Sequence, residues 1–161
     1  MAEAFFAEGS RLLTPAAFAF VLDNEMKRAA RSQNFFTLLV LDAKRVFKDM
    51  MVTADDGTLS DVAQVVGPLV RETDALARTD TGMLSLLLLD ADFDNSVRVV
   101  DRLVSHFERY ELPTAVHVAI GAACFPTHAT DVSTLKRQAA LNLILSGRSG
   151  MSLPKKAQSD N

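Results

Sequence analysis

The chain has 161 residues, of which 48% are hydrophobic and 23% are charged, an ordinary composition for one globular domain with its own core. Lys and Arg number 17 against 20 for Asp and Glu, and this near balance excludes any general attraction for nucleic acid or an anionic membrane. The single cysteine cannot form an internal disulfide, and no apolar run is of membrane length. We therefore expect a soluble cytoplasmic protein with one domain over residues 1–150 and a flexible polar tail over residues 151–161.

The N-terminal part predicts a helix and then a buried strand. Thr14 as N-cap and Pro15 at the first helical position begin a helix whose apolar residues recur at the helical period to about Ser32. Residues 35–41 form a nearly continuous apolar run, typical of a strand buried on both faces, with Asp42 at its end. Residues 43–58 are ambiguous, and their apolar residues are compatible with a short helix: Val46, Phe47, Met50 and Met51.

The rest of the chain predicts a hairpin set among helices. The helical period returns from residue 59 to residue 70, with a bend at Gly67-Pro68. Residues 75–78 and 83–89 predict two strands joined by a tight turn that contains Gly82. A helix that is capped within residues 90–94 and ends before Leu112 follows, then a strand over 114–124 and a last helix from about Val132 to Ser146. This order predicts a ferredoxin-like α+β fold, with a central mixed sheet that includes the hairpin and is flanked by helices.

The same order resembles the GGDEF domain of diguanylate cyclases over nearly the whole chain. The resemblance rests on residues 38–42 of the first strand, on the hairpin after Ala77-Arg78, and on residues 118–122 of a late strand. It implies the nucleotide-cyclase palm fold and a role in bacterial signalling. Active members condense two GTP molecules into cyclic diguanylate, and their hairpin turn presents a metal-binding carboxylate followed by an essential Glu.

The resemblance also identifies a non-consensus, degenerate signature. Aligned from Arg78, its five positions read Asp80, Thr81, Gly82, Met83 and Leu84. Gly82 replaces the metal carboxylate and Met83 replaces the Glu, and neither supplies the hard oxygen ligands that Mg²⁺ requires. Asp42 matches the family's other metal carboxylate, which we interpret as vestigial. We expect no catalytic residue, no metal and no cofactor, unless Asp80 or Asp90 substitutes at the turn.

Other substrate contacts of the family are also changed. The position of its phosphate-binding Lys in the last helix aligns with Ile144, which cannot bind phosphate. Asp56 matches the family's later guanine-contacting Asp, whereas the earlier Asn-Asp pair has no clear equivalent. GTP binding is therefore not expected.

One motif of the family is retained. Arg71 and Asp74 form an Arg-x-x-Asp pattern, and five residues separate Asp74 from Asp80, as in the inhibitory site of active members. An Arg fork can bind phosphate or the Hoogsteen edge of guanine, and a carboxylate can accept from guanine N–H groups. The alternative is a surface ion pair worth roughly 0.2–1 kcal/mol. Arg78 either assists this site or pairs with Asp80.

Two functions follow from these residues. The first is a catalytically inactive GGDEF-like receptor that binds cyclic diguanylate through Arg71 and Asp74. The second is a nucleotide-independent module for a signalling protein partner or a homodimer, with an apolar surface formed by Met83, Leu84 and Phe47. The three histidines show no ligand spacing, so a zinc site is not expected: His106, His117 and His128.

Overall fold

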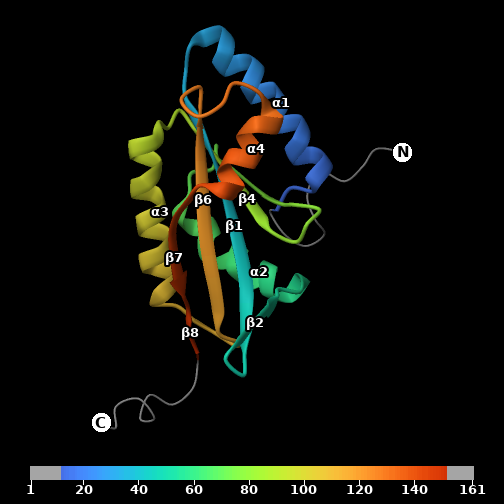
Figure 1. Cartoon of the computed structure of the whole chain (residues 1–161), viewed down its shortest axis with the longest axis vertical. Helices are drawn as coiled ribbons and strands as arrows, with labels where there is room; N and C mark the ends of the chain where they lie inside the picture. Colours follow the sequence, from blue (N-terminus) through green and yellow to red (C-terminus); the bar gives the residue numbers. More distant parts are fainter. Residues whose placement is uncertain (1–11, 152–161) are drawn as a thin grey trace.

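The structure is a computed structural model that describes residues 12–151 of the chain (Figure 1). The polar tail expected over residues 151–161 lies outside the described residues, apart from Met151. Within them, no helix is both long and apolar enough to cross a membrane. The helices are α1 (Pro15–Ser32), α2 (Asp56–Val66), α3 (Phe93–Glu108) and α4 (Val132–Leu141), with a 3₁₀ turn, η1 (Gly67–Leu69). The strands are β1 (Phe36–Phe47), β2 (Met50–Thr53), β3 (Ala75–Arg78), β4 (Leu84–Leu89), β5 (Glu111–Leu112), β6 (Val116–Phe125), β7 (Leu143–Arg148) and β8 (Gly150–Met151).

Each of these four α-helices begins at a side-chain cap. Thr14 accepts a hydrogen bond from the backbone N–H of Ala17, and three aspartates do the same for α2, α3 and α4: Asp55, Asp92 and Asp131. An N-cap oxygen satisfies one of the backbone donors that lack a partner in the first turn. The expected bend at Gly67-Pro68 is present, because α2 ends at Val66 and passes into the 3₁₀ turn.

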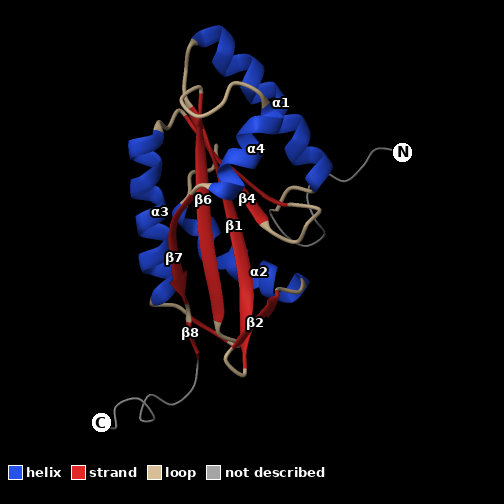
Figure 2. Ribbon diagram, viewed as in Figure 1, coloured by secondary structure: helices blue, strands red, loops and turns tan. Residues whose placement is uncertain are grey.

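The large sheet has the strand order β3-β4-β1-β6-β7, and β2 pairs with β1 beyond the end of β4 (Figure 2). All the pairings described within it are antiparallel, so the expected mixed sheet is wrong in this detail. β1 and β3 run in the same direction, as a crossover through α2 requires, but β4 lies between them. The predicted β3–β4 hairpin is confirmed, and the α+β palm fold with it.

Helices cover both faces of the sheet in three layers (Figure 1). Alternate residues of β1 and β4 face opposite sides, as the pleat of a strand requires. Leu39, Leu41 and Leu86 pack in the core beneath α2 and α3, whereas Leu38 and Leu87 pack beneath α1 and α4. Gly121 allows the closest approach, since a Cβ atom at this position would lie 2.0 Å from the carbonyl oxygen of Ala139 in α4.

The structure decides the ambiguous segment and corrects the end of the last helix. Residues 43–53 form no helix; β1 continues to Phe47, and a two-residue turn at Lys48 and Asp49, with φ of 52° and 64°, returns the chain as β2. The last helix ends at Leu141 instead of Ser146, and residues 143–148 form the edge strand β7. In both segments the apolar residues fit the helical period and the strand period equally well. Pairing with a neighbouring strand decides that they form strands.

Candidate functional site

The turn between β3 and β4 carries the signature positions and is held by Thr79. The Thr79 backbone N–H donates to the Met83 carbonyl at 2.9 Å, and the Thr79 hydroxyl accepts from the Met83 N–H at 2.9 Å. Gly82 has a φ of 84°, in the left-handed region that favours glycine. Asp80 and Thr81 are exposed at the turn, Met83 is half-buried, and the Leu84 side chain is fully buried. The expected apolar surface of Met83, Leu84 and Phe47 is therefore wrong, because Leu84 belongs to the core.

Asp42 lies within β1 rather than at a strand end. Its register partner is Ala119 on β6, and its carboxylate pairs with the Lys44 ammonium at 3.2 Å, with 40% of the Asp42 side chain exposed. A hollow of about 560 Å³ lies beside the turn, between α1, α4 and the sheet, and its walls include Phe18, Val40 and Met83. The apolar wall comes mainly from α1 and β1, whereas the turn and α4 contribute charged side chains, among them Asp80 and Lys136.

Arg78 does not pair with Asp80, one of the two roles expected for it. Its guanidinium forms an ion pair with Asp56, in the first turn of α2. Asp56 is the residue that the resemblance matched to a guanine contact, so Arg78 already engages this carboxylate. Ile144 lies on β7 and packs against the core, so it stands on a strand and not on the last helix.

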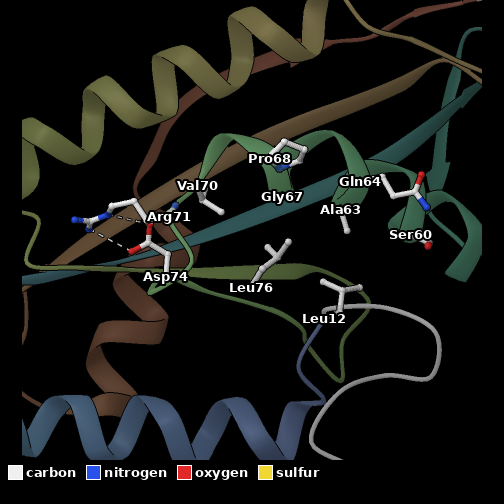
Figure 3. A pocket seen from close by; sticks show the side chains of 10 residues that line it. All are labelled: Leu12, Ser60, Ala63, Gln64, Gly67, Pro68, Val70, Arg71, Asp74 and Leu76. Carbon is white, nitrogen blue, oxygen red and sulfur yellow. Dashed lines mark hydrogen bonds and ion pairs between the residues drawn. The ribbon is translucent and has the colours of Figure 1, made fainter.

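Arg71 and Asp74 face each other in a local cluster (Figure 3), and hydrogen bonds to Leu89 tie their loop to the end of β4. The Asp74 carboxylate accepts from the Arg71 backbone N–H at 3.1 Å, from Arg71 Nε at 3.4 Å and from Arg71 Nη2 at 3.3 Å. It also accepts from the Leu89 N–H at 3.2 Å, and Arg71 Nη2 donates to the Leu89 carbonyl oxygen. The Asp74 side chain is only 3% exposed, compared with 59% for Arg71. This pair is more than a surface ion pair, because the Asp74 side chain is almost fully enclosed and holds two backbone donors.

Hollows lie on both sides of this cluster. One, of about 310 Å³, is bounded by α2, η1 and β3, and its walls include Ser60, Gln64 and Leu76 (Figure 3). The other, of about 300 Å³, extends toward α3 and includes Asn95 and Arg102. Arg102 donates to the Leu69 carbonyl at 3.0 Å, so a second guanidinium borders the same hollow as Arg71. Nothing in the sequence singles out Arg102, because charged residues on the outer face of an amphipathic helix are ordinarily there to contact water.

The histidines do not meet. Within residues 12–151, no three His, Cys, Asp or Glu side chains come close enough to hold a metal ion. His128 Nδ1 accepts a hydrogen bond from the Cys124 backbone N–H at 2.9 Å, which fixes the loop after β6.

Comparisons with known proteins agree with this architecture. The family described as "Diguanylate cyclase, GGDEF domain" matches residues 11–152, so the chain belongs to the GGDEF domain family. Its fold is similar to that of the GGDEF domain of PA1120 (TpbB or YfiN) from Pseudomonas aeruginosa, with 21% identity, coverage of 84% of each chain and a TM-score of 0.72. No curated protein sequence matches the chain.

Two other solved structures show such domains with partners. The GGDEF domain of DgcB from Caulobacter crescentus, solved in complex with c-di-GMP, is 19% identical, with a TM-score of 0.69 and coverage of 87% of this chain and 88% of that one. The diguanylate cyclase SiaD from Pseudomonas aeruginosa, solved with its activator SiaC, is 17% identical, with a TM-score of 0.68 and coverage of 86% of this chain and 56% of that one. At these identities the likeness concerns the fold alone.

Proposed function

We propose that this GGDEF domain does not synthesise cyclic diguanylate but binds it as a regulatory receptor in bacterial signalling, through Arg71 and Asp74. The observation that carries the proposal is the exposed Arg71 guanidinium, held by a buried carboxylate between two hollows. A cytoplasmic location stays a prediction from the sequence.

The donor set at the turn does not suit a divalent cation. Mg²⁺ requires several oxygen ligands in octahedral geometry, and a triphosphate needs its charge neutralised by metal. Gly82 and Met83 bring no side-chain oxygen, Asp80 is the single carboxylate of the turn, and the one carboxylate on β1, Asp42, is paired with Lys44. These residues support a domain without cyclase activity.

The Arg71 cluster offers donors to an anionic ligand. Within the described part of the chain, the hydrogen bonds of Arg71 engage Nε and Nη2, which leaves the two N–H donors of Nη1 for phosphate or a guanine edge. Arg102 adds a second positive charge in the same hollow. Asp74 already accepts four hydrogen bonds, so its main part in this receptor is to fix Arg71, and contact with guanine N–H groups requires it to exchange partners.

Isothermal titration of the whole chain with cyclic diguanylate tests the receptor. We expect saturable binding with a micromolar dissociation constant, weakened about 10- to 100-fold by Arg71→Ala, because a hydrogen bond to a charged group contributes about 1.5–3 kcal/mol. Arg102→Ala should weaken binding less. Arg31→Ala, at the exposed end of α1, is the matched control and should bind like the parent chain. Absence of heat with the folded parent chain would rule out the receptor.

The second candidate is a nucleotide-independent interaction module. Large exposed apolar side chains favour it: Phe47, Met50 and Met51 on the β1–β2 hairpin, and Leu141 and Leu143 where α4 meets β7. A partner that binds equally well with and without cyclic diguanylate, and equally well to Arg71→Ala, would support this function instead.

A further inference from the structure

The hollow of about 560 Å³ beside the signature turn is separate from the Arg71 cluster. It lies between α1 and α4, which cover the same face of the sheet (Figure 1), and β1 and β4 form its floor. It shares no lining residue with the two hollows beside Arg71. Sites for small molecules commonly have volumes of roughly 300–1,000 Å³. The hollow is therefore large enough for a small ligand of its own.

Ser85 lies at the floor of this hollow, and its hydroxyl has no partner. It stands on β4 between Val40 of β1 and Ala77 of β3, and it is only 6% exposed. Within residues 12–151 no group forms a hydrogen bond with this hydroxyl, and its oxygen is not fully enclosed by protein atoms. Buried polar groups are normally hydrogen-bonded. The hydroxyl can therefore be reached from the hollow and is free to bond a ligand, as donor or acceptor.

The walls around Ser85 suit an aromatic ring. Phe18 of α1, Val40 of β1 and Met83 of the turn line the hollow, and the Phe18 side chain is itself almost completely buried. A second ring packs well against Phe18 in an offset or edge-to-face arrangement, and a methionine sulfur makes favourable contacts with ring edges. The body of the ligand is therefore apolar, with one polar atom directed at Ser85.

One charge of each sign stands at the rim. Lys136 of α4 and Asp80 of the turn line the hollow and are exposed, and neither takes part in an ion pair within the described chain. The third charged side chain of the lining, Arg78, is already paired with Asp56. The rim thus has no excess of positive charge for a triphosphate. It complements a ligand that carries one ammonium and one carboxylate.

We propose that this hollow binds a free amino acid with a hydroxylated aromatic side chain, such as tyrosine. The ligand carboxylate pairs with Lys136 and the ammonium with Asp80, while the phenolic hydroxyl bonds Ser85. A molecule that lacks one of these groups leaves a polar group of the site without a partner, which is how such sites discriminate among ligands. The proposal goes beyond the cyclic diguanylate receptor and does not depend on it.

Titration of the isotope-labelled chain with tyrosine, followed by NMR, tests the site. We expect saturable shifts of the amides at the turn and at Ser85, with a dissociation constant of about 0.1–1 mM for a ligand of this size. Three relatives of tyrosine each lack one group: phenylalanine the hydroxyl, tyramine the carboxylate, and para-hydroxyphenylpropanoate the ammonium. Each should bind about 3- to 30-fold more weakly. No shifts with tyrosine up to its solubility limit, or equal binding of phenylalanine and tyrosine, would overturn the proposal.

Variants assign the contacts. Ser85→Ala removes a hydroxyl that bonds nothing in the described chain, so it should fold and should bind tyrosine and phenylalanine equally. Lys136→Gln should bind tyrosine and tyramine about equally. Arg137→Gln, which changes the neighbouring cation of α4 that does not line the hollow, is the matched control and should keep the preferences of the parent chain. Circular dichroism verifies that all three variants fold. A preference for tyrosine over phenylalanine that survives in Ser85→Ala would overturn the proposal.

Discussion

At the scale of single residues, Asp74 is the side chain whose role the structure changes most. The sequence allowed a weak surface ion pair, but the carboxylate is buried and accepts from two backbone N–H groups as well as from Arg71. A buried acceptor with four donors is costly to remove, because each donor is then left without a partner. Asp74 therefore matters for the loop even without a ligand.

We predict that Asp74→Asn lowers the free energy of unfolding by about 1–3 kcal/mol, because the neutral amide loses the charged bonds and turns N–H donors toward Arg71. Urea unfolding followed by circular dichroism measures this change. Asp56→Asn is the matched control, since Asp56 also pairs with an arginine but its side chain is 84% exposed, and we expect less than about 0.5 kcal/mol there. Similar losses for both variants would contradict the structural role of Asp74.

Two other aspartates make stability depend on pH. The hydrogen bonds from the Thr58 backbone and side chain lower the pKa of Asp55 below its ordinary 3.8, and those from Thr134 lower the pKa of Asp131 in the same way. A carboxyl group with a lower pKa in the folded state stabilises the fold above its ordinary pKa, and that contribution is lost as the pH falls through the folded pKa. Both act as caps, of α2 and α4 respectively.

The double variant Asp55→Asn, Asp131→Asn should therefore be less stable than the parent chain at about pH 6 and equally stable at about pH 2, because Asn caps a helix without titrating. Urea midpoints measured across this range would show the two curves converging on the acid side. Parallel curves would mean that these caps do not contribute through their charge.

At the scale of elements, the fit of α4 against β6 depends on Gly121. We predict that Gly121→Ala lowers the free energy of unfolding by about 1–3 kcal/mol or more, since its Cβ atom would lie 2.0 Å from the Ala139 carbonyl oxygen and would push α4 from the sheet. Thermal unfolding compares it with Gly67→Ala, whose Cβ atom would meet nothing within 4 Å. An equally stable Gly121→Ala chain would show that α4 does not pack so closely.

Some elements could be predicted from the sequence and others could not. α1 and the β3–β4 hairpin can be predicted from local sequence. Thr14-Pro15 marks the start of the helix, and Gly82 marks a tight turn, where it adopts a positive φ. β2 and β7 do not, because their short apolar stretches fit a helix as well as a strand. Only the free edges of β1 and β6 decide that these segments pair as strands. The same limit applies to Arg102, which lines the same hollow as Arg71 because α3 packs beside that loop.

At the scale of the whole molecule, the proposed loss of cyclase activity can be tested by turnover. Incubation of the chain with GTP and Mg²⁺ or Mn²⁺ should give no cyclic diguanylate above a protein-free blank, because the turn brings no side-chain oxygen at Gly82 or Met83. An active diguanylate cyclase assayed in parallel is the control. Product that disappears in Asp80→Ala or Asp90→Ala would instead identify a substitute carboxylate.

The sequence by itself determined the order of the main elements, the family and the identity of the residues at the signature turn, because these depend on local periods, caps and residue types. The tertiary structure alone decided how those residues meet. It paired Arg78 with Asp56, buried the side chains of Leu84 and Asp74, and placed Arg102 on the same hollow as Arg71. Such contacts join segments far apart along the chain, and hydrogen bonds and packing between them leave no periodic trace in the sequence.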